Sequence, residues 1–171
     1  MAEFVKTEWV NGAAPGISAQ ELNRMEQGIY DAHRPIIAMV RAAAAQTIPS
    51  TGVPTRVIFG TVQFDPFNLW DPINNHLALP KGIYLVEAQV YCNEPDKMGT
   101  IQVMTDPWQD VDSLRVSWPT SKHIKSSGFL DIQEAAGANV FVTVSTNALN
   151  FKISETPART FLHVVKISDR A

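Results

Sequence analysis

Hydrophobic residues follow two different periods along this chain, and the change falls near residue 50. Residues 17–46 form one long stretch with a helical period, in which Ser18 and Glu21 make a capping box at its start. The apolar seam has the alternating spacing of three and four residues that is typical of a heptad, at Leu22, Met25, Ile29, Ala32, Ile36, Met39, Ala43 and Gln46. Since one helix cannot bury so narrow a stripe alone, we predict an α-helical coiled-coil stalk over residues 18–46.

Pro35 interrupts this predicted helix. A proline in a helix interior removes one hydrogen bond and costs about 3 kcal/mol. We therefore expect either a kink near residues 33–35 or two helices, with Pro35 in the first turn of the second. The alternative is that residues 18–46 fold back on their own head domain as packing helices, because short isolated helices are marginally stable.

Beyond the stalk the hydrophobic period becomes two. Residues 47–55 are rich in Pro, Gly, Ser and Thr and are predicted to be an extended linker, which places a head domain at residues 56–171. The head reads as strands rich in β-branched and aromatic residues, at 56–64, 82–92, 100–105, 113–118, 124–132, 139–145, 150–153 and 160–167. Short strands without intervening helices predict a mainly β fold, an antiparallel sandwich with a jelly roll as the leading topology.

Composition limits the classes of function. A formal charge of -3 over 171 residues and the lack of a polybasic run argue against binding to nucleic acid or to an anionic membrane. The single Cys92 excludes an internal disulfide framework and a cysteine-based zinc site. The first residues hold no apolar run of the kind found in signal peptides, so we expect a soluble protein made in the cytoplasm.

No motif in the sequence indicates an enzyme. His33, His76, His123 and His163 do not have the spacing of a metal site, and no nucleophile elbow or glycine-rich phosphate loop occurs. His163 is expected to face away from the core between Leu162 and Val164, and Cys92 is expected to be an inert core or interface residue. We therefore predict a protein without metal or cofactor.

Two loops carry candidate contact residues. Residues 105–113 offer Asp106, Asp110 and Asp112 beside Trp108, a combination that suits stacking on a sugar ring, or calcium binding by the carboxylates. The alternative is an acidic solvated loop whose tryptophan folds into the sandwich. The aromatic residues of segment 64–72 are more typical of a plug at one end of the sandwich, or of an intersubunit contact, than of a ligand site.

The N-terminal arm, residues 1–17, holds Phe4, Val5 and Trp9 among polar residues. These side chains either pack against the stalk or attach the protein to a partner. The following pattern W-x-N-G-x-x-P-x-I-S-A-x-x-L-N-x-M-E-x-G-I, from Trp9 to Ile29, resembles a segment near the N-termini of phage tail, baseplate and fibre proteins. In that family the segment precedes a trimeric stalk, so the resemblance implies a trimer.

The head also resembles a known superfamily. Residues 57–65, Trp70, the L-P-x-G-x-Y of Leu79 to Tyr84, the A-G-A-N-V of residues 136–140 and the closing F-L-x-V of residues 161–164 are similar to the globular heads of the complement and tumour necrosis factor superfamily. Such heads form tight trimers, which agrees with the implication of the N-terminal segment. The loops around Asp65 and Asp106 depart from the pattern of that superfamily.

Together these features favour a bacteriophage virion protein. It would be a homotrimer, attached to other virion proteins through its N-terminal arm and displaying its head to a host-surface glycan or protein. One alternative is a head fibre or capsid decoration protein. Another is a cellular trimeric ligand or adhesin of the tumour necrosis factor-like class.

Overall fold

The computed structural model describes residues 23–25, 36–49, 52–92, 99–106, 109–118, 122–149, 151–154 and 159–169, with side chains only at 114–117 inside the range 109–118. Residues 36–171 form one compact unit, and residues 1–35 are grouped apart from it. Within the described part of residues 1–35, Asn23, Arg24 and Met25 form a helical turn. The rest of the predicted arm and stalk, including Phe4, Val5, Trp9, Leu22, Ile29 and Ala32, lies outside the described residues.

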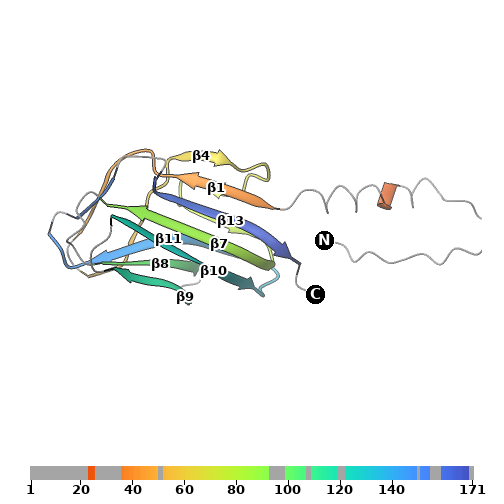
Figure 1. The fold of residues 1–171 in the computed structure, drawn as a ribbon. Helices are drawn as coiled ribbons and strands as arrows, with labels where there is room; N and C mark the ends of the chain where they lie inside the picture. Colours follow the sequence, from red (N-terminus) through yellow and green to blue (C-terminus); the bar gives the residue numbers. More distant parts are fainter. Residues whose placement is uncertain are drawn as a thin grey trace, which may run out of the picture. The chain divides into compact units, whose positions relative to one another are not determined.

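Two antiparallel sheets form the head (Figure 1). The first has the order β10-β7-β13-β1-β4 and consists of β1 (Ile37–Arg41), β4 (Thr61–Phe64), β7 (Gly82–Tyr91), β10 (His123–Ile132) and β13 (Phe161–Ser168). The second has the order β5-β6-β11-β8-β9, with β3 also paired to β11. Its strands are β3 (Thr55–Arg56), β5 (Trp70–Asp71), β6 (His76–Leu79), β8 (Gly99–Asp106), β9 (Gln109–Trp118) and β11 (Ala138–Thr146). A small separate sheet pairs β2 (Gln46–Ile48) with β12 (Phe151–Ile153).

The core lies between the two large sheets, and in the first sheet buried and outward residues alternate. In β7 the side chains of Tyr84, Val86, Ala88 and Val90 are completely buried, while the residues between them face the other side of the sheet. The facing sheet contributes Ile101, Val103, Val140, Val142 and Val144 to this core, and in β8 and β11 the residues between them are buried as well. Alternation of this kind is the mark of sheets with one face in the core. The predicted mainly β, antiparallel jelly-roll head is therefore confirmed.

The predicted helix does not extend through residues 37–41, which form strand β1. Ala38 and Val40 are fully buried, and β1 is paired on one side with β13 and on the other with β4. Met39, predicted in a trimer seam, thus belongs to the head, and Ile36 packs against the head core. The helical preference of alanine is worth less than 1 kcal/mol per residue, so pairing with two strands and core burial override it.

The predicted linker is also part of the fold. Gln46, assigned to the stalk, lies in β2, and its side chain accepts from Ile58 N at 2.9 Å and donates from Nε2 to Arg56 O at 2.8 Å. Thr55 and Arg56 form β3 on the edge of β11. The head consequently begins at Ile36 rather than at residue 56.

Most of the other predicted strands are present, with ends shifted by a few residues. β7, β8, β10, β11, β12 and β13 overlap their predicted ranges, and β9 starts earlier, at Gln109. The stretch predicted as one strand over 56–64 is divided into β3 and β4, and β5 and β6 were not predicted. In the segment predicted as a plug, Leu69 and Trp70 pack against the head core, and Trp70 lies edge to face with Phe59 at 6.1 Å between ring centroids, whereas Phe64 and Phe67 are exposed.

Single residues of the core agree with their predicted environments. Cys92 is fully buried, and His163 lies on the opposite side of β13 from the buried Leu162 and Val164. The Tyr84 hydroxyl donates to Pro80 O at 2.8 Å. Burial, together with the nearby carboxylate of Asp169, raises the pKa of Tyr84 above its ordinary value, so this phenol stays neutral.

Candidate functional site

The predicted contact loop at residues 105–113 is a β-hairpin for most of its length. Asp106 ends β8 and is exposed, whereas Asp110 and Asp112 belong to β9, in which Asp110 pairs with Met104. Trp108 lies outside the described residues. Between Gln102 and Met104 the register of β8 against β9 shifts, so β9 carries extra residues there. The four residues were predicted as one contact set, and that set remains a prediction.

In the part of the chain with described side chains, no group of three His, Cys, Asp or Glu residues is placed to hold a metal ion. Among the same residues, no helix is long and apolar enough to cross a membrane.

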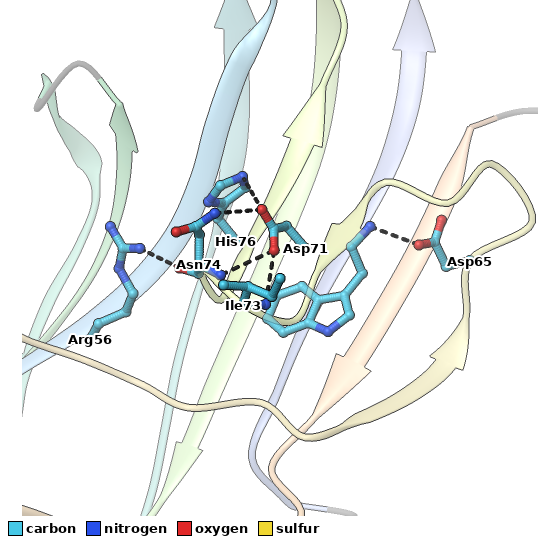
Figure 2. A network of polar contacts seen from close by, with 7 residues as sticks. Arg56, Asp65, Asp71, Ile73, Asn74 and His76 are labelled. Atoms are coloured by element: carbon cyan, nitrogen blue, oxygen red, sulfur yellow. Dashed lines mark hydrogen bonds and ion pairs between the residues drawn. The ribbon is translucent and has the colours of Figure 1, made fainter.

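A network of polar contacts surrounds the turn between β5 and β6 (Figure 2). Asp71 Oδ1 accepts from the backbone N–H groups of Ile73 at 2.8 Å and Asn74 at 3.0 Å, and Oδ2 accepts from the Asn74 side chain at 2.7 Å. His76 Nε2 lies 3.8 Å from the same Oδ2. Pro72 fixes the first turning residue, so an aspartate followed by proline forms the turn locally.

The same turn is fastened to neighbouring segments. Asn75, with a positive φ of 58°, donates from its side chain to Val57 O at 2.7 Å and accepts from Phe59 N at 3.0 Å. Arg56 donates to Asn74 O at 2.5 Å, and its guanidinium lies 3.8 Å from the ring centroid of Phe141. Ile73, at the tip, is 91% exposed. We call residues 71–75 the clamped turn; it presents an isoleucine to solvent on a fixed backbone.

A sequence signal for this region was available. The tetrapeptide Asp-Pro-hydrophobic-Asn occurs at residues 65–68 and again at 71–74. In the first copy Asp65 accepts from Leu69 N at 2.9 Å and Trp70 N at 2.8 Å, so both aspartates cap a turn with backbone N–H groups. The repeat lies in and just after the segment predicted as an aromatic plug, and it was not recognised from the sequence.

The stability of the protein at acid pH tests the role of the Asp71 charge in the clamped turn. The hydrogen bonds from Asn74 and Ile73 to the Asp71 carboxylate lower the pKa of Asp71 below 3.8. A lowered folded-state pKa stabilises the fold above the unfolded-state pKa, and this contribution is lost as the pH falls through the folded-state value. Asp71→Ala is therefore expected to lower the melting temperature at pH 6 and to differ less from the parent near pH 2. Calorimetry would measure both, with Asp106→Ala as the control; an equal deficit at the two pH values would contradict this role of the charge.

The second candidate surface is the solvent-facing side of the first sheet, which we call the outer face. Strand pairing places Ile37 opposite Val165, Val165 opposite Leu85, and Leu85 opposite Phe129. These four residues form an apolar row across β1, β13, β7 and β10, in which Phe129 is 67% and Leu85 38% exposed. Ile167 on β13 and Phe64 on β4, which pairs with Met39, are also more than half exposed. A continuous apolar strip of this kind marks an interaction surface more often than a free one.

Comparison with solved structures identifies the architecture. The chain is similar to Eiger TNF from S. frugiperda, with a TM-score of 0.57 and 16% identity over 81% of this chain and 96% of that one. The head has the jelly-roll fold of tumour necrosis factor ligands. Murine APRIL is similar at a TM-score of 0.56 and 16% identity, over 77% of this chain and 99% of that one. The predicted resemblance of the head to the tumour necrosis factor superfamily is thus confirmed at the level of the fold.

Comparison with known sequences does not assign the chain to a family. No family model matches the chain. Structure-specific endonuclease subunits SLX4 1 and SLX4 2 of Candida tropicalis are each 27% identical to it over 128 residues, or 74% of this chain. The chain spans only 18% of the length of these curated relatives. The phage-like N-terminal segment falls on residues of which only 23–25 are described, so that resemblance stays a prediction.

Proposed function

We propose that this protein is a non-enzymatic attachment protein, a homotrimer that self-associates through the apolar row of its TNF-like head and displays the rest of the head to a target surface. The observation that carries the proposal is the apolar row of Ile37, Val165, Leu85 and Phe129. Burying a side chain of this size is worth about 1.5–3 kcal/mol. Leaving the row in water would forgo that gain and favour nonspecific aggregation.

A second copy of the chain is the occupant that best fits this surface. The row lies on a regular sheet whose backbone is fixed by pairing on both sides of β1, β13 and β7, so it needs no rearrangement before binding. Closed rings of identical subunits are the usual way to cover such a surface. The sequence resemblance of the head to a superfamily of trimers supports the number three.

The biological setting that we propose is a bacteriophage virion, with the N-terminal arm, including Phe4, Val5 and Trp9, joining other virion proteins. The support is the phage-like segment from Trp9 to Ile29. A capsid decoration protein would use the same trimer. A cellular ligand of the tumour necrosis factor class is favoured by the similarity to Eiger TNF and APRIL. DNA cleavage of the kind named for the SLX4 subunits is outside the proposal, because the matched region is a small part of those proteins.

Two measurements on the full chain test the proposal. Light scattering at micromolar concentration is expected to give about three times the subunit mass of 18.9 kDa, and a monomer would contradict self-association. Labelled antibody on purified phage particles should then mark the tail for an attachment protein or the shell for a decoration protein. Particles without label would remove both virion roles and leave the cellular ligand.

A further inference from the structure

The outer face changes in character away from the apolar row. Toward the ends of β1 and β7 and the starts of β13 and β10, which lie together at one end of the sandwich (Figure 1), the outward residues become cationic and aromatic. Arg41 pairs with Phe161, Phe161 with Gln89, and Gln89 with Lys125. Tyr91 and His123 pair in the next position. We call this group, with Arg159, the distal patch.

Among the described residues, neither arginine of the distal patch forms an ion pair with a carboxylate. Arg41 Nε is buried and has no hydrogen-bond acceptor among the described residues. The Arg159 guanidinium stacks over the Tyr91 ring at 4.8 Å, and its backbone carbonyl accepts from Gln89 Nε2 at 2.8 Å, which fixes this segment against β7. Among the described outward residues around the patch, Glu87 is the carboxylate, and it is paired with Lys125 at 2.7 Å. Counted over the described residues, the patch therefore carries more positive than negative charge, within a chain whose formal charge is -3.

Aromatic side chains lie beside the charged side chains of the distal patch. Tyr91 and His123 lie 4.6 Å apart between ring centroids, and Phe161 stands between Arg41 and Gln89. With strands about 4.8 Å apart, the row from Arg41 to Lys125 is ~14 Å long. That length suits two or three sugar units more than a single small anion. Partly exposed rings supply stacking faces, and guanidinium groups bind carboxylate or sulfate groups in two-point contacts.

We propose that the distal patch binds a negatively charged polysaccharide, one that carries sulfate or carboxylate groups along a chain of sugars. The inference rests on the proposed attachment function and specifies its target class. In this arrangement the apolar row joins the subunits, and the distal patch of each subunit faces the glycan. Threefold display would strengthen a weak single contact, since linked sites raise avidity by ~10² or more.

Binding of the full chain to immobilised heparin tests the proposal for sulfate, and polygalacturonate tests it for carboxylate. Uncharged dextran is the negative probe, and polyglutamate is a charged probe without sugar rings. The parent protein should bind at least one acidic polysaccharide, bind polyglutamate more weakly and leave dextran unbound. Arg41→Gln with Arg159→Gln should weaken binding about tenfold or more, and the slope of log affinity against log salt should fall by about one for each arginine.

Matched controls separate the patch from overall charge. Arg115→Gln with Lys81→Gln removes one charge from β9 and one from the residue before β7, at the opposite end of that strand from Tyr91, and should leave binding within about twofold. Arg41 is partly buried at the end of β1, so its substitution also changes that strand. Comparing the binding of Arg159→Gln alone with that of Arg115→Gln alone tests the patch while β1 stays unchanged. An equal loss in patch and control variants would overturn the site, and equal binding to polyglutamate would overturn the glycan assignment.

The result is independent of the test for self-association. A monomer that binds heparin through Arg159 would keep this inference and contradict the trimer. A protein with the mass of a trimer that binds none of the polysaccharides would contradict this inference and keep the trimer.

Discussion

Leu85→Ser combined with Phe129→Ser is expected to convert the oligomer into monomers. The two residues are directly opposite each other on β7 and β10 and form one end of the apolar row. At about 1.5–3 kcal/mol for each buried side chain, the pair contributes on the order of 3–6 kcal/mol per interface, so the dissociation constant should rise by ~10²–10⁴. Light scattering at micromolar concentration would detect the change in mass.

The clamped turn offers a matched control for this experiment. Ile73 and Ile58 are 91% and 58% exposed and lie away from the outer face, in the turn and in the segment that Asn75 holds. Ile73→Ser with Ile58→Ser removes a similar amount of exposed apolar surface and should leave the mass unchanged. If both double variants kept the parent mass, the apolar row would not be the subunit contact. If the control alone dissociated, the contact would lie on the clamped turn.

Gly137→Ala is expected to be among the most destabilising single substitutions in the head. Gly137 has a φ of +81°, and its N–H donates to Glu134 O at 2.9 Å in the turn between β10 and β11. A Cβ built at this position would lie 2.3 Å from Leu79 O and 3.1 Å from Pro80 Cα. These are backbone atoms of Leu79, the last residue of the paired strand β6, and of Pro80 after it, so they cannot rotate away. Strain at such a backbone conformation alone costs about 1–3 kcal/mol, and the overlap adds to it.

Thermal unfolding measures this effect. For a protein of this size each kcal/mol lowers the melting temperature by about 2–4 °C, so a decrease on the order of 10 °C is expected. Gly52→Ala is the comparison, since Gly52 also has a positive φ, of +70°, but its Cβ would meet the movable side chain of Asn147. A decrease no larger at position 137 than at position 52 would show that the β6 backbone can shift to accept the methyl group.

The jelly roll was predictable because its strands repeat a local pattern. Alternation of Tyr84, Val86, Ala88 and Val90 with outward residues is visible without knowing what they contact. Strand β1 was missed because residues 37–46 satisfy two periods at once. Met39, Ala43 and Gln46 have the spacing of a helical seam, while Ala38, Val40 and Ala42 alternate with outward residues; these last three are buried at 1% exposure or less. The choice depends on β4 and β13, and the latter is more than 100 residues away.

By itself the sequence determined the fold class, most strand positions and the environments of Cys92 and His163, because each follows from short-range alternation of side chains. The tertiary structure alone decided where the head begins and which side chains share a surface. The apolar row joins residues 37, 85, 129 and 165, and the distal patch joins residues 41, 91, 125 and 159. Each of these residues looks ordinary in its own strand. Only strand pairing sets them side by side, and the register of that pairing is fixed by burial of the opposite face of the sheet.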